Sequence, residues 1–451
     1  MNEPVVVTGL GVVSPHGDAP QAMFDALLRG ESALQPVFPE LPKPAAAATV
    51  AFDVARWFTK LQLAGVDRVS QLAVAAADLA LRDAGTSPRD ADLDPERVGV
   101  YAGCGMGGAA ALEAGYRSGG RVPPLTIPAF MPNAPAAHVA MRQGVLGPVL
   151  TYSVACASSA VAIAEAAAAI QRGDLELAIA GGSEALIVPG VVLAWQAMQT
   201  LAAFGPGGAA RAARPFASDR CGFALGEGAA FVVLESAGRA RRRGARVHAQ
   251  LAGWGIGSDA THLTKPDAPG QARALRAALR RADLAPRDVG YCNAHGTATR
   301  IGDVVERDAL ALVWGRCPRH LARQLHQGTA RPPARRCRRA RSGDHGARLA
   351  ARRTAAEHQR RRGRSGLRDE PGARTRHARA GARRCDQQLI RVRGHERGAA
   401  FHPRLIDTVG EAPKTPVAIE AEIIAAQRLR PPARPSRLCS RSNPVQPESR
   451  R

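Results

Sequence analysis

The chain has 451 residues, 45% of them apolar, which is enough for two or three domains or one large duplicated α/β unit. Its formal net charge of +23 is uneven, because residues 1–315 hold 28 Lys and Arg against 28 Asp and Glu, whereas residues 316–451 hold 34 against 11. The eight cysteines show no zinc-ligand spacing, and neither a signal segment nor a run of roughly 20 apolar residues is found. We therefore expect a cytoplasmic protein without a metal site, a disulfide framework or membrane contact.

Short apolar runs bounded by glycine alternate with helical stretches, which is typical of a layered α/β protein with buried strands. In chain order, strands are expected near Val5, Val98, Leu177, Ala229, Val247 and Val289. Helices are expected at Ser70–Gly85, Val161–Gly173 and Gly270–Leu284, each with a stop signal close behind.

A glycine-rich segment, CGMGGAA at Cys104, follows the second expected strand. Gly105, Gly107 and Gly108 do not complete the dinucleotide-binding fingerprint, and no acidic residue follows about 20 positions later in the needed context. The segment is therefore interpreted as close backbone packing rather than as a phosphate-binding loop.

Cys156 is the candidate reactive thiol. It lies in TYSVACASSAVAIAEAAAAI, where a short β-prone run ends and a helix of small residues starts directly behind the cysteine. The first-turn N–H groups of that helix would point at the sulfur, and the positive helix end favours a thiolate. The alternative is an inert core thiol, which is the interpretation given to Cys104, Cys221 and Cys292.

A second group of candidate residues lies in NAHGTATRIGD, from Asn293 to Asp303. It places His295 after an expected strand, at the edge where open α/β sheets usually carry their sites. Thr297 and Thr299 offer two hydroxyls that could hold a polar tether, and Asp303 is expected to cap the next helix.

These segments together resemble the β-ketoacyl-acyl-carrier-protein synthases, elongating condensing enzymes of the thiolase superfamily. The resemblance covers Pro4 to about Gly315 and includes VVVTGLGVVSPHGD, PNAPAAH, VACASSA, GGSEA, RPFASDRCGFALGEGAA, GSDATHLTKPD and NAHGTATRIGD. It implies an α/β, thiolase-like αβαβα fold of two similar halves, in which residues 1–246 form the first half and residues 247–315 begin the second.

The resemblance also implies roles for individual residues. Cys156 would accept the acyl group, His295 would be one of two active-site histidines, and Thr297 and Thr299 would bind phosphopantetheine. The implied reaction is acyl transfer to the cysteine followed by decarboxylative condensation with malonyl carrier protein in fatty-acid synthesis.

The same resemblance extends to the acyl pocket and the partners. Met106 and Trp195 fall where acyl-pocket residues occur in the family, and Trp195 would shorten that pocket and favour short or unusual acyl groups. An acyl carrier protein and a second copy of the chain would be the partners. Condensation needs neither a metal ion nor a redox cofactor.

Beyond Gly315 the chain lacks the family's second histidine, its lysine and a Gly-Phe-Gly-Gly-Thr-Asn-like turn. Written in G/C-rich codons and read one nucleotide later, Leu325–Arg339 becomes Ser-Thr-Lys-Ala-Leu-His-Gly-His-Leu-Leu-Gly-Ala-Ala-Gly, and Cys385–Ala400 permits Ala-Thr-Ser-Asn-Ser-Phe-Ala-Phe-Gly-Gly-Thr-Asn-Ala-Ala. We therefore hypothesise a frameshift between about Gly315 and Leu325. Residues 316–451 would then be out of frame and disordered, the second half truncated, and the product unstable and impaired in condensation.

Two other functions are consistent with the sequence. Within the same class, the chain could be a polyketide or aryl-polyene ketosynthase, or a catalytically silent partner subunit. Of another class, the clustered arginines of residues 316–451 could bind nucleic-acid phosphates. That stretch has no recognised binding motif and almost no aromatic residues, so no specific nucleic-acid partner is expected.

Overall fold

The computed structural model describes residues 3–205, 208–262, 264–315, 322–325 and 419–425. Among these residues the strands form a nine-stranded sheet, ordered β11-β8-β1-β7-β6-β4-β5 with β2 and β3 beside β7, and a two-stranded sheet of β9 and β10. The strands are β1 Val5–Val13, β2 Gln35–Val37, β3 Ala45–Ala48, β4 Val98–Gly103, β5 Val149–Tyr152, β6 Leu177–Ala185, β7 Leu225–Ser236, β8 Ala249–Ser258, β9 Tyr291–Ala294, β10 Ala322–Leu325 and β11 Ile419–Ala425.

The α-helices of the described residues include the three that the sequence predicts, now α2, α6 and α9. They are α1 Pro20–Arg29, α2 Arg68–Ala84, α3 Ala109–Arg117, α4 Thr126–Phe130, α5 Ala134–Gln143, α6 Ser158–Arg172, α7 Pro189–Ala197, α8 Ala237–Arg242, α9 Ala268–Ala282 and α10 Gly302–Trp314. The six expected strands are also confirmed, as β1, β4, β6, β7, β8 and β9.

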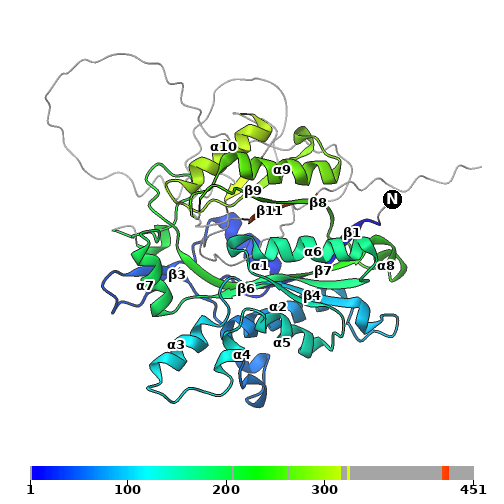
Figure 1. Cartoon of the computed structure of the whole chain (residues 1–451), viewed down its shortest axis with the longest axis horizontal. Helices are drawn as coiled ribbons and strands as arrows, with labels where there is room; N and C mark the ends of the chain where they lie inside the picture. Colours follow the sequence, from blue (N-terminus) through cyan, green and yellow to red (C-terminus); the bar gives the residue numbers. More distant parts are fainter. Residues whose placement is uncertain (1–2, 206–207, 263, 316–321, 326–418, 426–451) are drawn as a thin grey trace, which may run out of the picture.

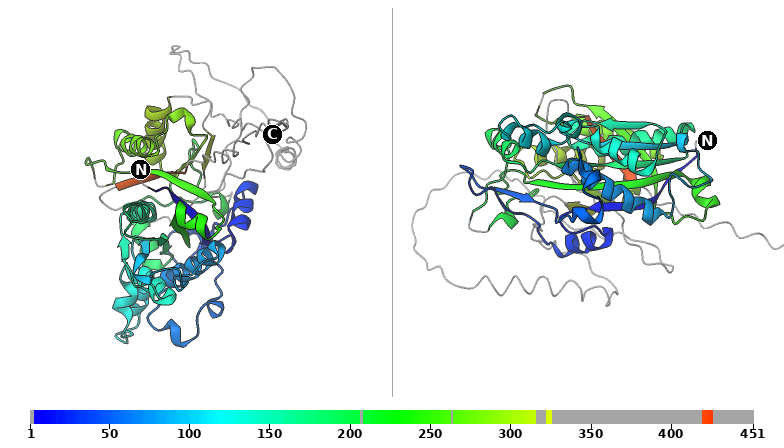
Figure 2. Two further views of the ribbon diagram at one scale, coloured as in Figure 1. Left: turned by 90° about the vertical axis from the view of Figure 1, so that its right-hand side faces the viewer. Right: turned by 90° about the horizontal axis from the view of Figure 1, so that it is seen from below.

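The elements stack in five layers around α6. Figure 1 shows α6 above β4, β6 and β7 and below β8 and β11, with α2 and α5 on the far side of the lower strands and α9 and α10 at the top. The side view of Figure 2 shows the same separation of the upper helices from the lower body. The αβαβα layering expected from the sequence is therefore present, and α6 is its central helix.

The composition of α6 follows from this central place. Its sequence SSAVAIAEAAAAIQR is dominated by alanine, and the largest buried apolar side chains are Ile163 and Ile170. They share one core with Leu251 and Trp254 of β8 on the upper side and with β-strand residues on the lower side. Small side chains let two strand layers approach one helix at normal packing density.

Each half of the fold uses two strand glycines to bring a helix into backbone contact. A Cβ at Gly9 or Gly11 of β1 would lie 2.1 or 1.9 Å from the carbonyl oxygens of Ala80 and Ala76 in α2. On β8, a Cβ at Gly253 or Gly255 would lie 2.5 or 2.0 Å from the carbonyl oxygens of Ala278 and Ala274 in α9. The same strand–helix packing therefore occurs twice, as two similar halves require.

The junction of the halves is an antiparallel pairing of β1 with the start of β8, from Val5 opposite Leu251 to Val7 opposite Ala249. Two short strands come from the range for which the sequence predicts disorder. β10 pairs parallel with β9, and β11 pairs antiparallel with β8; the rest of residues 316–451 lies outside the described residues.

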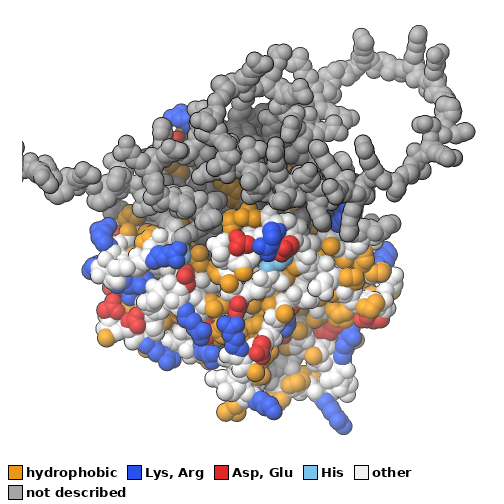
Figure 3. Space-filling model, turned by 180° about the vertical axis from the view of Figure 1, so that it is seen from behind, with side chains coloured by type: hydrophobic (Ala, Val, Ile, Leu, Met, Phe, Trp, Pro, Cys, Tyr) orange, Lys and Arg blue, Asp and Glu red, His pale blue; other side chains and the backbone are white. Residues whose placement is uncertain are grey.

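The visible surface of the described part is mixed in character. Figure 3 shows Lys and Arg side chains interspersed with Asp and Glu and with apolar side chains on the rear face. Within the described ranges, no helix has the length and apolar character needed to cross a membrane.

The close approach of α2 to β1 predicts a large cost for the smallest side chain at Gly11. In Gly11→Ala the new methyl group would meet the backbone of Ala76, so the helix must move, and overpacking of this kind costs about 1–3 kcal/mol of the free energy of unfolding. The matched control is Gly257→Ala on β8, where an added Cβ meets nothing within 4 Å. Urea denaturation should show a lower midpoint for Gly11→Ala only; equal midpoints would contradict this packing.

Candidate active site

The turn that carries Cys156 is short and held by hydrogen bonds. β5 ends at Tyr152, a 3₁₀ turn spans Ala155–Ala157, and α6 begins at Ser158. Ala155 has φ +54, a left-handed conformation that costs a non-glycine residue on the order of 1 kcal/mol. The Ser158 hydroxyl compensates, because it accepts from the Val154 N–H at 2.9 Å and donates to the Ala155 carbonyl at 2.6 Å.

Cys156 is half-buried at the carboxyl edge of the parallel strands β4, β5 and β6. Two glycines allow α6 to start there, since a Cβ at Gly103 would lie 2.2 Å from the Ser159 nitrogen and one at Gly182 would lie 2.7 Å from the Ser159 Cβ. The start of α6 is therefore pressed against the ends of β4 and β6. A thiol at such a helix start, at this edge of an α/β sheet, has the setting of a nucleophile.

His295 begins the loop between β9 and α10 and is half-buried. Its backbone N–H donates to Glu306 Oε1 at 2.6 Å, and the N–H of Gly296 donates to Glu306 Oε2 at 2.8 Å. Gly296 and Ala298 both have positive φ, so the loop is tightly curved. One buried carboxylate of α10 thus fixes the two residues at the start of the loop.

The structure brings the two predicted threonine hydroxyls together. Thr297 Oγ1 and Thr299 Oγ1 are 2.9 Å apart, and the Thr299 hydroxyl also accepts from the Gly302 N–H at 3.0 Å. Thr297 is buried and Thr299 is half-buried. His295, Thr297 and Thr299 therefore share one loop of the second half, whereas Cys156 lies at the start of α6 in the first half.

The prediction that Asp303 caps α10 is wrong. The N-cap residue is Ile301, and Asp303 lies in the first turn with its carboxylate accepting from the Phe216 N–H at 2.5 Å and from the Thr297 hydroxyl at 3.4 Å. Burial raises the pKa of Asp303, while these donors and nearby Arg220 oppose that rise. Asp303 therefore connects the segment around Phe216 to the loop between β9 and α10, residues 295–301, which we call the histidine loop.

Arg220 adds a second tie between the same segments. Its Nε donates to the Thr299 carbonyl at 2.9 Å, and its Nη2 donates to the Arg300 carbonyl at 2.7 Å. Neither Glu306 nor Arg220 is among the site residues predicted from the sequence. A signal exists for Glu306, because Asp303 and Glu306 are three residues apart and so share one face of a helix that is otherwise rich in apolar residues.

Met106 and Trp195 lie on separate segments. Met106 is exposed on the loop after β4, and Trp195 of α7 is buried with Val192 and Leu225, its ring edge-on to Phe223 at 5.3 Å between centroids. Their assignment to an acyl pocket stays a prediction.

The glycine-rich segment after β4 is packed rather than open. Added Cβ atoms at Gly107 and Gly108 would each lie 2.2 Å from a carbonyl oxygen, of Phe130 and Ala129 respectively, which confirms the close backbone approach. Cys104 is buried as expected, and burial raises the pKa of its thiol far above the usual range.

The other two cysteines, Cys221 and Cys292, are half-buried rather than buried. Across the described ranges, no cluster of three or more His, Cys, Asp or Glu side chains is placed to hold a metal ion.

Comparison with known proteins gives two adjacent family matches. The model of the β-ketoacyl synthase N-terminal domain matches residues 2–240, and that of the C-terminal domain matches residues 248–326. Among similar proteins, Nodulation protein E of Rhizobium sp. (strain N33) is 37% identical over 324 residues, covering 70% of this chain and 78% of the relative. The 3-oxoacyl-[acyl-carrier-protein] synthase 2 of Staphylococcus aureus (strain N315) is 33% identical over 331 residues, covering 71% and 79%.

A solved structure shares the fold. It contains a type II PKS acyl-carrier protein in complex with its ketosynthase bound to the hexaketide. The superposition has a TM-score of 0.65 at 28% identity and covers 73% of this chain and 82% of that one.

Proposed function

The chain belongs to the β-ketoacyl synthase family, and on that premise we propose that it accepts an acyl group on Cys156 in fatty-acid or related polyketide synthesis. The observation that carries the proposal is the turn before α6. There the left-handed Ala155 and the Ser158 hydroxyl fix a half-buried thiol at a helix start. A helix start lowers the cost of a thiolate, which is the nucleophilic form of cysteine.

The proposed first step is thioester exchange. The Cys156 Sγ attacks the carbonyl carbon of an acyl thioester, a new carbon–sulfur bond forms, and the bond to the carrier breaks. The phosphopantetheine thiol of the carrier leaves with a proton. Thioester exchange changes no oxidation state, so the proposed step uses neither a redox cofactor nor a metal ion.

The family's second step joins a malonyl unit to the bound acyl group. Malonyl carrier protein loses carbon dioxide, the carbanion attacks the acyl carbon, and the Cys156 thiolate is released. We assign to His295 a hydrogen bond to the malonyl thioester oxygen as enolate charge grows, an effect worth roughly 10²–10³ in rate per donor. The Glu306 carboxylate supports this role by fixing the backbone of His295.

For the carrier we propose that Thr297 and Thr299 bind phosphopantetheine. The adjacent hydroxyls support this, since they present two polar atoms on one side of the histidine loop. An acyl carrier protein is the proposed partner, and a carrier protein accompanies the ketosynthase in the similar solved structure.

We further propose that this chain stops after acylation. The similar region spans 78–79% of the two relatives, and the C-terminal family match ends at residue 326, next to the proposed frameshift between about Gly315 and Leu325. The second histidine, the lysine and the glycine turn of the family belong to the part that is not matched. Cys156 and its turn lie in the matched region, whereas the family's glycine turn, which supplies the second N–H of the oxyanion hole, does not. Acylation should therefore be slow, and condensation should fail.

A homodimer through β5 is the proposed assembly. β5 is an edge strand of the sheet, and its Val149 and Leu150 are 38% and 43% exposed, with Met141 and Leu146 exposed beside it. An exposed apolar edge strand is a template for pairing with another chain. Pairing with a catalytically silent relative through the same strand is the alternative.

Acylation predicts a labelled cysteine. On incubation with acyl carrier protein carrying a short acyl group, the intact chain should gain one acyl mass at Cys156, and Cys156→Ala should lose it at least 100-fold, because the nucleophile is gone. Peptide mass spectrometry measures both. Cys221→Ala, which removes another half-buried thiol, is the control and should be acylated normally. Acylation of Cys156→Ala would refute the proposal.

The frameshift predicts a single-base difference. Sequencing codons 310–330 should reveal one missing or extra base, and the gene with the frame restored should encode an enzyme that condenses at least 10²-fold faster, because it regains transition-state donors. Formation of the β-ketoacyl product is the measurement. An intact frame with no such base would contradict the hypothesis.

The edge strand predicts the assembly. Leu150→Arg should shift sedimentation from dimer to monomer, because it places a charge in an apolar contact. Leu61→Arg is the control, since Leu61 is 89% exposed and lies in the 3₁₀ turn Leu61–Leu63, away from β5 in the chain. A Leu150→Arg protein that is still dimeric would place the interface elsewhere.

A further inference from the structure

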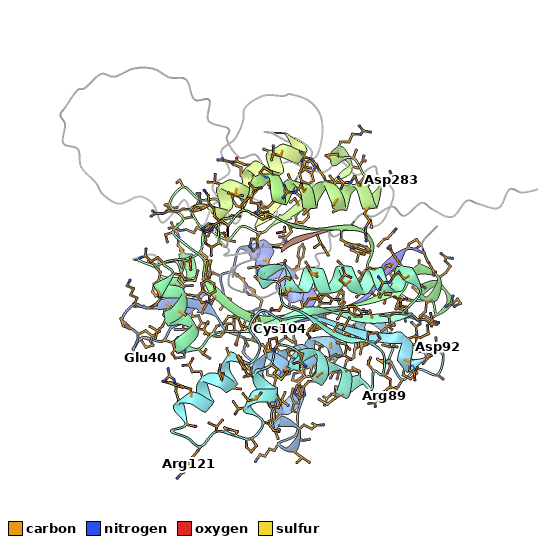
Figure 4. The ribbon with its side chains drawn as sticks, in the orientation of Figure 1. Glu40, Arg89, Asp92, Cys104, Arg121 and Asp283 are labelled. Carbon is orange, nitrogen blue, oxygen red and sulfur yellow. The ribbon has the colours of Figure 1, made fainter. Side chains whose placement is uncertain are left out.

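The buried carboxylate of Glu184, near the end of β6, holds the loop that follows β4. Glu184 is 3% exposed, and its Oε2 accepts from the Gly105 N–H at 2.7 Å. The Met106 N–H donates to the same carboxylate, and the Cys104 Sγ lies 4.0 Å from Oε1. Figure 4 shows Cys104 in the centre of the molecule, whereas the labelled charged residues lie at its periphery. Glu184 therefore places a titratable group in the interior.

The loop after β4 is also hydrogen-bonded to the segment between β5 and α6 that carries Cys156, the nucleophile turn. The Gly105 carbonyl accepts from the Ser153 hydroxyl at 3.1 Å, and the Cys104 N–H donates to the Tyr152 carbonyl at 3.1 Å. Ser153 precedes Cys156 by three residues. A continuous path therefore leads from the Glu184 carboxylate through the Gly105 peptide to the segment that presents the thiol.

The surroundings of Glu184 make its charge sensitive to pH. Burial is the main cause that raises the pKa of Glu184 to about 7, and the N–H groups of Gly105, Met106 and Ala185 oppose the rise. The charged group that faces it is Asp67 at the start of α2, which raises the pKa further. Because the folded-state pKa is raised, burial of Glu184 stabilises the fold at low pH, and this contribution is lost as pH rises through about 7.

We propose that Glu184 is a positioning residue for Cys156. Its carboxylate accepts hydrogen bonds from the Gly105 and Met106 N–H groups, and the Gly105 carbonyl in turn binds the Ser153 hydroxyl and so fixes the turn that presents the thiol. The inference rests on the proposed function only in taking Cys156 as the reacting group. The charged carboxylate forms stronger hydrogen bonds than the protonated acid. The hydrogen bonds from the loop to Glu184 therefore become stronger as pH rises, although the buried charge destabilises the folded protein. The backbone of Met106 is held by the same carboxylate.

The experiment measures alkylation of Cys156 by iodoacetamide from pH 6 to pH 9, with peptide mass spectrometry to separate Cys156 from the other cysteines. Wild type should show an extra rise near pH 7 beside the thiolate titration. Glu184→Gln should lack that rise, react about fivefold more slowly at pH 8 and equally at pH 6, the difference between a charged and a neutral acceptor. Its Tm at pH 8 should not be lower than that of wild type, because the buried charge is gone.

Two further variants complete the design. Ser153→Ala removes one of the two hydrogen bonds between the loop and the nucleophile turn, at an exposed side chain, and should reduce the rise even where Glu184→Gln folds poorly. Glu227→Gln is the matched control, because Glu227 is a buried carboxylate that binds Arg68 and the Val50 N–H instead of the loop, and it should keep the wild-type profile.

Equal alkylation rates of wild type, Glu184→Gln and Ser153→Ala at pH 8 would overturn the inference. Alkylation requires no acyl transfer, so its outcome is separate from that of the proposed function. A wild-type protein that shows the pH 7 rise but is never acylated would refute the proposed function and support the positioning role.

Discussion

Backbone-to-backbone packing of helices on glycine-bearing strands is the constraint on which the rest of this structure depends. At Gly11 and Gly255, and again at Gly103, a helix lies so close that even a methyl group has no room. The first two contacts build the outer layers, and the third places the start of α6 against the end of β4. Because α6 is enclosed by strand layers on both sides, its start cannot move without displacing the core. The position of Cys156 follows directly from that enclosure.

Each half also contains one buried carboxylate that holds a neighbouring loop in place through hydrogen bonds. Glu184 accepts from the N–H groups of Gly105 and Met106, and Glu306 accepts from those of His295 and Gly296. In both cases a buried carboxylate on a regular element binds two consecutive backbone donors of a neighbouring loop. Charge-assisted bonds of this kind are stronger than neutral ones and rigidify the donor segment. The candidate site thus consists of loops that are fixed through their backbones, which leaves the side chains available for chemistry.

The predictability of these features from sequence depends on how local their cause is. The strands and helices could be predicted because glycine-bounded apolar runs and small-residue helices depend on neighbours in the chain, and the turn at Cys156 has the same local origin. Glu184 and Gly105 are 79 residues apart, so no local pattern reveals their bond. The pattern wrongly predicts Asp303 as a helix cap, because an acidic residue at a helix start usually caps it, whereas this carboxylate accepts from the Phe216 N–H, 87 residues away. Contacts of this range depend on strand order, which periodicity does not determine.

The residues that position Cys156 and those that position the histidine loop lie in different parts of the chain. Three of the contacts that position Cys156 lie between Gly103 and Glu184: the glycine contact with Ser159, the Ser158 bonds and the Glu184 loop. The histidine loop depends instead on Glu306 and Asp303, near the end of the matched region. A change of frame after Gly315 leaves the sequence of the nucleophile and of these three contacts unchanged. It removes the family's second histidine and lysine from condensation, and it removes the glycine turn that supplies an oxyanion-hole N–H, so acylation should be slowed and condensation should fail.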